Sequence, residues 1–137
     1  MPFVLISAPV YKRDWILNEW FSCIENQNFP LENIGFQFEA GTDDRKTIDA
    51  LMDFYNEHPE VKCFDININS QETHTTHIEG QRAWKQERYF TMANFRNNLL
   101  NRAICKNPDR FFSLDTDILL ENPETIDILY NMTENLD

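Results

Sequence analysis

Short apolar runs alternate with amphipathic segments of helical period along most of the chain. The apolar runs have the length of strands, and the amphipathic segments place apolar side chains three and four residues apart. Such an alternation is typical of a mostly parallel sheet with helices over its faces. We therefore predict a three-layer α/β/α fold. The predicted strands are 3–8, 33–38, 61–66 and 110–120, and the predicted helices are 14–26, 45–57, 91–106 and one that opens at 122–124.

Polar clusters fall where three of these strands end, at 9–13, 39–44 and 115–117. In parallel α/β sheets, ligands bind outside the carboxyl ends of the strands, where the strand order reverses. The shared location of the clusters therefore predicts one ligand site at that edge. The chain contains neither Gly-X-Gly-X-X-Gly nor a phosphate-loop motif, so the sequence carries no dinucleotide or ATP fingerprint.

Asp115 and Asp117 stand one residue apart after an apolar run. In regular strand geometry their side chains would share one face about 7 Å apart. Two carboxylates at a strand end can hold a hard divalent cation that keeps open positions for phosphate oxygens. The alternative interpretation is a pair of solvated acids before a turn.

The segment 67–88 is polar and lacks a helical or strand pattern, so we predict a long loop. His74 and His77, three residues apart, have the spacing to face one metal ion. The segment offers no cysteine and no third ligand at a suitable spacing, so solvated loop histidines are favoured over a metal site.

The net charge is −11 and no basic run occurs, which argues against duplex nucleic acid or an anionic membrane as a partner. The three cysteines, Cys23, Cys63 and Cys105, are widely spaced, and we interpret them as reduced thiols rather than a disulfide or zinc framework. No apolar stretch approaches 18 residues and the N-terminus lacks a signal-peptide layout. We therefore expect no membrane span and a cytoplasmic location.

Four motifs follow one another along the chain. They are the strand end Ala8-Pro9-Val10-Tyr11, the acidic turn 39–44, the helix segment Phe95-Arg96-Asn97, and the strand 111–117 with its Asp-X-Asp ending. In this order they resemble the donor-binding half of a GT-A-type glycosyltransferase, similar to the large family 2 group. This resemblance extends over nearly all 137 residues and implies a Rossmann-like nucleotide-diphospho-sugar transferase fold.

The resemblance implies a nucleoside-diphosphate sugar, UDP-sugar favoured, and Mn²⁺ or Mg²⁺ as cofactor. It implies that Asp117 ligates the cation, and that Asp115 is a second ligand or supports the ribose, the sugar or a metal-bound water. The other nucleotide-sugar-binding candidates are Pro9, Tyr11, Arg13, Glu39, Asp44 and Arg96.

Each role has a simpler alternative. Tyr11 either stacks on the base or covers the sheet edge, and Arg96 either contacts the phosphates or is a surface arginine. Glu39 would accept a hydrogen bond from the base imide, although the family has Asp there. Asp43 and Asp44 are equally suited to cap the following helix, and we favour a cap for at least one of them.

The family's acceptor-binding half, with its catalytic carboxylate, follows the Asp-X-Asp strand, but only about 20 residues follow Asp117 here. We therefore expect one donor-binding domain over 1–137, with the acceptor half missing and the acceptor unknown. The alternative function is a non-catalytic nucleotide-binding or protein-interaction module. A phosphohydrolase of the haloacid-dehalogenase type is disfavoured, because its Asp-X-Asp lies on the first strand and needs a downstream lysine and acidic pair.

Overall fold

The computed structural model describes residues 2–69 and 86–133, apart from the side chains of 86–89 and 91. Most of the predicted polar loop, including His74 and His77, lies outside these residues. At its two ends the loop prediction was wrong, because 67–69 belong to a strand and 86–88 to a helix.

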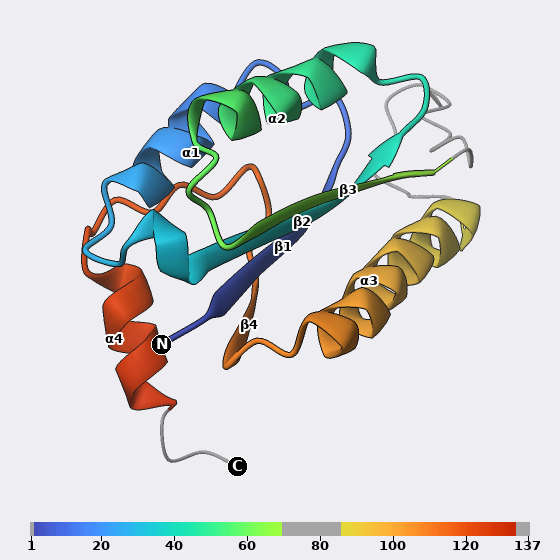
Figure 1. Cartoon of the computed structure of the whole chain (residues 1–137). Helices are drawn as coiled ribbons and strands as arrows, with labels where there is room; N and C mark the ends of the chain where they lie inside the picture. Colours follow the sequence, from blue (N-terminus) through green and yellow to red (C-terminus); the bar gives the residue numbers. More distant parts are fainter. Residues whose placement is uncertain (1, 70–85, 134–137) are drawn as a thin grey trace.

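Four parallel strands form one sheet in the order β3-β2-β1-β4. They are β1 (Val4–Val10), β2 (Ile34–Gly41), β3 (Cys63–Asn69) and β4 (Arg110–Ser113). The chain steps outward from β1 to β2 and β3, and then returns to the other side of β1 to add β4 (Figure 1). The strand order therefore reverses beside β1, and the carboxyl ends of β1 and β4 flank the reversal.

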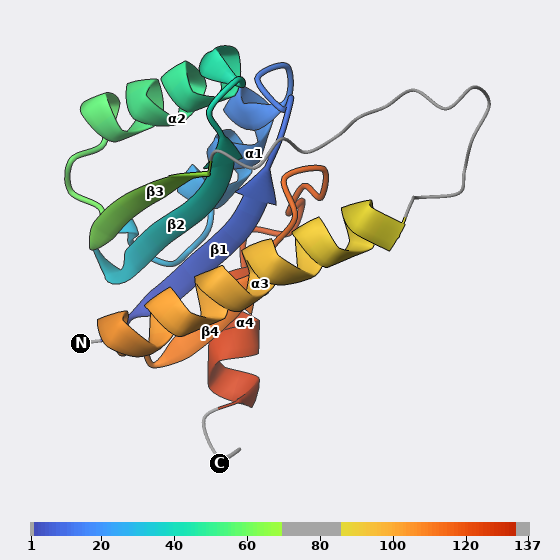
Figure 2. The same cartoon turned by 90° about the vertical axis from the view of Figure 1, so that its right-hand side faces the viewer.

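Helices cover both faces of the sheet, which confirms the predicted α/β fold. Helices α1 (Leu17–Glu25) and α2 (Arg45–Glu57) lie on one face, and α3 (Gln86–Lys106) crosses the opposite face (Figures 1 and 2). A 3-10 turn, η1 (Leu31–Asn33), precedes β2, and α4 (Thr125–Met132) lies beside the amino ends of β1 and β4. The position of α3 follows from the return crossover between β3 and β4.

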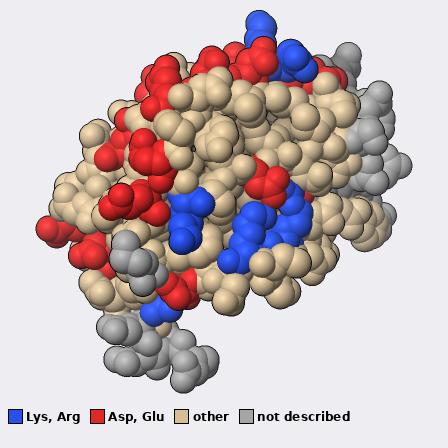
Figure 3. All heavy atoms as spheres, in the orientation of Figure 1, with Lys and Arg blue, Asp and Glu red and all other residues tan. Residues whose placement is uncertain are grey.

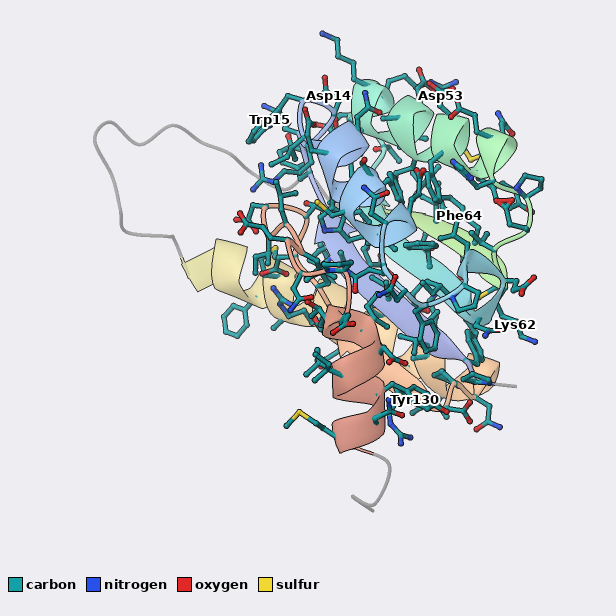
Figure 4. All side chains as sticks on the ribbon, turned by 90° about the vertical axis from the view of Figure 1, so that its left-hand side faces the viewer. Asp14, Trp15, Asp53, Lys62, Phe64 and Tyr130 are labelled. Carbon is teal, nitrogen blue, oxygen red and sulfur yellow. The ribbon has the colours of Figure 1, made fainter. Side chains whose placement is uncertain are left out.

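The face of the sheet under α1 and α2 is built from aromatic side chains. Phe36 and Phe38 of β2 have no exposed surface and meet the Trp20 ring of α1 with centroids 6.2 and 5.9 Å away. Phe21 stacks on Phe54 of α2 at 3.8 Å. Figure 4 shows Phe64 of β3 pointing toward α2. This layer fixes α1 and α2 on the sheet by apolar burial.

On the opposite face of the sheet, the contact with α3 is partly apolar and partly polar. Phe95, Leu99 and Ala103 of α3 are buried, as is Leu5 of β1. Toward β3 the contact between α3 and the sheet becomes polar and charged. The side chains of that polar layer are Gln37 and Glu39 of β2, Asp65 and Asn67 of β3, and Arg102 and Lys106 of α3.

Several predicted boundaries were wrong, while α2 was predicted residue for residue. β2 runs through Gly41 and β3 through Asn69, because the polar side chains at these strand ends find partners inside the polar layer. Helix α3 begins at Gln86, five residues before the predicted start. The added turn is polar but contains Gln, Glu and Arg, which are good helix formers.

The first helix and the last strand are shorter than predicted. Helix α1 begins at Leu17, three residues after the predicted start at Asp14, where we expected the N-cap. It follows a turn in which Arg13 O accepts hydrogen bonds from Ile16 N and Leu17 N. Strand β4 ends at Ser113, so Asp115 and Asp117 lie beyond the strand and not in regular strand geometry.

Candidate functional site

The turn after β1 is bonded to the turn after β2 at the carboxyl edge of the sheet. Together they present one surface there, and Figure 4 shows Asp14 and Trp15 beside it, at the end of the β1 turn. Two hydrogen bonds join the two turns: Tyr11 Oη to Asp43 Oδ2 (3.3 Å) and Lys12 N to Asp44 Oδ2 (2.5 Å). A third, from Arg13 N to Thr47 Oγ1 (3.1 Å), joins the turn after β1 to the first turn of α2.

The close approach of these turns depends on backbone geometry at two residues. Lys12 has a φ of 54°, in the left-handed region that non-glycine residues rarely adopt, and this turns its N–H toward Asp44. A Cβ on Gly41 would lie 3.7 Å from the Tyr11 ring and 2.8 Å from Asp43 Oδ1. The first distance is an ordinary contact, whereas the second is too short, so glycine makes room for the Asp43 side chain.

Asp44 occupies the N-cap position of α2, as one of our alternatives predicted. Its carboxylate does not cap the helix, however, and accepts instead from Lys12 N. Asp44 is buried, so this bond is part of the packed structure rather than a surface contact. Its position supports a structural role in holding the two turns.

Glu39 lies in β2, two residues before the carboxyl end of the strand, and has no exposed surface. Asn67 Nδ2 donates to both of its oxygens, at 3.1 and 2.9 Å, and Arg102 Nη1 donates to Oε1 at 2.9 Å. A buried carboxylate needs such partners, because an unpaired buried charge is strongly unfavourable. The predicted contact of Glu39 with a base would have to displace or share these donors.

Arg102 also pairs with Asp65, and Lys106 joins the same group. Lys106 Nζ donates to Asp65 Oδ2 and to Gln37 Oε1, both at 2.9 Å. Burial by itself would raise the pKa of Asp65, but the hydrogen bonds and charges of Lys106 and Arg102 outweigh it and hold that pKa below its ordinary value. Figure 3 shows basic side chains gathered around an acidic group over β3 and α3. The network ties the C-terminal half of α3 to the sheet.

The segment after β4 leaves the sheet but stays anchored to it. Leu114 N donates to Ser7 O at 3.1 Å, and the indole N–H of the buried Trp20 donates to the main-chain oxygen of Asp115 at 3.1 Å. Leu114 and Thr116 are buried, whereas Asp115 is half-buried and Asp117 is exposed. The alternation turns the two acidic residues away from the core.

Arg96 of α3 contacts this acidic segment directly. Its guanidinium lies 3.2 Å from Asp115 Oδ1 and donates to Ser113 Oγ at 3.3 Å. The structure therefore brings together two residues that the sequence placed in one site. Asp115 and Arg96 supply an anion and a cation at the carboxyl end of β4, beside the reversal of strand order.

The remaining candidates lie around this edge. Pro9 is half-buried in β1, opposite Glu39 in the register. The Arg13 side chain folds back on its own turn and donates to the main-chain oxygens of Tyr11 (3.3 Å) and Lys12 (3.5 Å).

Asp115 and Asp117 are the candidate ligands for a cation. Within the described residues, no group of three or more His, Cys, Asp or Glu side chains is arranged to enclose a metal ion. Two carboxylates fit a hard cation that takes its other ligands from water and phosphate, as Mg²⁺ commonly does. They do not fit a cation held by protein alone.

A cavity of about 200 Å³ lies at the other end of the sheet, between β4 and α4. Its walls are mainly apolar, with Arg110 and Thr133 as the polar contributors, and the Arg110 guanidinium stacks over the Tyr130 ring. An apolar cavity of this kind does not suit a diphosphate. The candidate site is therefore the polar carboxyl edge.

Three residues that shape the site escaped the sequence interpretation. Trp20 lies in the predicted helix 14–26 and was read only as one of its apolar residues. A buried indole N–H needs an acceptor, however, and this need was the available signal. Asn67 was assigned to the loop. Arg102 stands four residues before Lys106, and this pair marked a basic stripe on α3 that faces the acidic residues of β2 and β3.

Comparisons with known proteins agree with this geometry. The chain matches the sequence model of glycosyltransferase family 25, N-terminal domain, over residues 1–136. A glycosyltransferase 25 family member from Aedes aegypti is 23% identical over 126 residues, which make up 91% of this chain and 21% of the relative. The motifs resemble family 2, and the matching family is family 25.

Solved structures share the fold. The mannosyltransferase PcManGT from Pyrobaculum calidifontis, in complex with GDP-Man and Mn²⁺, has a TM-score of 0.72 and 16% identity, covering 98% of this chain and 33% of that one. S. aureus TarS in complex with UDP has a TM-score of 0.65 and 16% identity, covering 98% and 32%. The predicted GT-A fold is thus confirmed.

The chain spans about a fifth to a third of the length of these proteins. Among the described helices, none combines the length and apolar composition that crossing a bilayer requires. Since the family match covers almost the whole chain and the fold agrees with it, the chain belongs to glycosyltransferase family 25, as its N-terminal domain.

Proposed function

We propose that this chain is the donor-binding part of a glycosyltransferase and binds a nucleoside-diphosphate sugar at the carboxyl edge of the sheet. The observation that carries the proposal is the contact between Arg96 and Asp115 beside the reversal of strand order. A site for a metal-bound diphosphate needs both an anion for the cation and a cation for the phosphates, and this edge supplies both.

Each side chain has a role in the proposal. The Tyr11 ring, whose hydroxyl donates to Asp43, stacks on the base. Arg96 contacts the phosphates through its planar guanidinium. Glu39 holds the amide of Asn67 in place, and its contact with the base remains a prediction.

Asp117 and Asp115 would hold Mn²⁺ or Mg²⁺, in keeping with the oxygen ligands that these cations prefer. When bound, the cation stabilises the negative charge that the diphosphate gains as it leaves the sugar. Asp117 is exposed and Asp115 half-buried, so both are accessible to a ligand arriving from solvent.

The nucleobase of the sugar donor and the source of the acceptor-binding part are also proposals. One structural relative was solved with GDP-Man and another with UDP, and we favour UDP for this chain. The acceptor-binding part and its catalytic carboxylate would come from the portion of the relatives that this chain does not match. Binding of nucleotide without transfer, in the presence of that portion, would instead support a non-catalytic nucleotide-binding module.

The first test is ligand-dependent stabilisation. UDP with Mn²⁺ is expected to raise the melting temperature of the chain, because a ligand that binds only the folded state adds about 2.7 kcal/mol at 100 times Kd. EDTA should abolish the shift. GDP, CDP and dTDP with Mn²⁺ are the comparison set, measured by differential scanning fluorimetry. A folded sample that shows no shift with any of the four would overturn the proposal.

The second test concerns the predicted cation ligand. Asp117→Asn keeps the size of the side chain but removes its charge, and is expected to weaken Mn²⁺-dependent nucleotide binding by at least about tenfold, or 1.4 kcal/mol. Asp53→Asn is the matched control, because Asp53 is an exposed acid on α2, far from the site (Figure 4). Equal affinity for wild type and Asp117→Asn in titration calorimetry would show that Asp117 is a surface acid.

A further inference from the structure

Arg96 and Asp115 form a partly exposed ion pair within the proposed site. The Arg96 side chain is 44% exposed and that of Asp115 is 45% exposed. Ion pairs with this exposure are weak, typically worth about 0.2–1 kcal/mol, so a competing partner can separate them. The guanidinium has a second, neutral acceptor in Ser113 Oγ.

The same carboxylate is a proposed cation ligand, which places Arg96 in competition with the cation. While the guanidinium lies against Oδ1, the charge of Asp115 is already partly neutralised and attracts a divalent cation less. A cation that arrives alone and takes this oxygen displaces Arg96 from its anionic partner. A diphosphate changes this balance, because its oxygens offer the arginine a new bidentate partner.

We propose that Arg96 couples the two ligands: it opposes binding of the cation alone and favours binding of the cation together with the diphosphate. This inference rests on the proposed function and adds a coupling to it, in which the nucleotide and the cation each bind more tightly when the other is present. By linkage, the effect is reciprocal, so the cation gains affinity from the nucleotide as much as the nucleotide gains from the cation.

The surroundings of Arg96 allow this exchange without movement of the helix. Phe95, directly before Arg96, is only 2% exposed, and Leu99 in the next turn is 3% exposed. Arg102 and Lys106 tie the same helix to β2 and β3 through Glu39 and Asp65. The backbone of α3 is therefore anchored on both sides, and a rotation of the arginine side chain is enough to change partners.

The test is Arg96→Met on the full 137-residue chain, which keeps side-chain length and removes the charge. The affinity for Mn²⁺ alone, measured from the free-ion signal in electron paramagnetic resonance, is expected to rise by about two- to fivefold, as loss of a weak ion pair implies. The affinity for UDP or GDP with saturating Mn²⁺, measured by calorimetry, is expected to fall about tenfold, because a charge-assisted contact with phosphate is lost. The two changes have opposite signs.

Lys62→Met is the matched control, because Lys62 is an exposed cation before β3, at the opposite end of the sheet from the site (Figure 4). It should change neither affinity, and Arg96→Lys should restore part of both. If wild type binds no nucleotide with Mn²⁺, the proposed function fails. If wild type binds but Arg96→Met weakens both affinities, or leaves the affinity for Mn²⁺ alone unchanged, the coupling role is wrong while the proposed function stands.

Discussion

Replacing Arg102 with methionine is expected to lower the free energy of unfolding by about 3–5 kcal/mol, because it leaves a buried carboxylate without its charged partner. Glu39 has no exposed surface, and Arg102 Nη1 lies 2.9 Å from its Oε1. The neutral amide of Asn67 would remain as its hydrogen-bond donor. Domains of this size are typically stable by about 5–15 kcal/mol, so the variant would lose a large part of its stability.

Urea unfolding followed by circular dichroism measures this loss. Adding Glu39→Gln to the variant should recover part of the stability, since the double variant buries no unpaired charge. Arg45→Met serves as the control for stability, because Arg45 and Asp49 form an exposed ion pair on α2, and its cost should stay within about 0.5 kcal/mol. A loss below about 1 kcal/mol for Arg102→Met would mean that Arg102 is not the partner that stabilises the buried Glu39 side chain.

Replacing Trp20 with alanine is expected to cost about 3–5 kcal/mol, the range for a large aromatic removed from a packed core. Trp20 is 1% exposed, its ring lies against Phe21, Phe36 and Phe38, and its indole N–H holds the main-chain oxygen of Asp115. The variant should therefore also lose metal-dependent nucleotide binding, because the acidic segment after β4 is released.

Trp20→Phe separates these two effects. It retains most of the aromatic burial but leaves the Asp115 oxygen without the indole donor, at a cost of about 1–3 kcal/mol. We expect it to weaken Mn²⁺-dependent nucleotide binding more than Cys23→Ser, a control at a half-buried position of the same helix. Unchanged nucleotide affinity in Trp20→Phe would show that the indole contact does not position Asp115.

The fold was predictable wherever apolar periodicity dictates it. Helix α2 was predicted with its observed bounds, because its buried side chains recur at helical spacing and Pro59 follows its end. The parallel sheet follows from the alternation of elements. The four motifs were in turn sufficient to indicate the GT-A fold.

Strand ends whose polar side chains are stabilised by partners far away in the sequence could not be predicted from apolar periodicity. Glu39 and Asn67 looked like turn and loop residues, since the partner that allows them into strands, Arg102, lies on a helix encoded far downstream. The end of β4 was likewise missed, because the apolar residues after Asp117 continue the pattern of a strand while the backbone has already left the sheet. Sequence placed Arg96 and Asp115 in one site, but their direct contact required coordinates.

The central position of β1 has a consequence for how the chain is made. Strands β2 and β3 follow within the first half of the sequence, so this part of the sheet and its aromatic layer are available early in synthesis. Strand β4 closes a much longer loop: Phe3 N binds the carboxylate of Asp109, 106 residues away. Contacts so distant in sequence form slowly, because loop closure precedes any gain from pairing. A nascent chain therefore holds an open edge on β1 until β4 emerges, and the residues that we propose as cation ligands are made after the three strands that form the rest of the sheet.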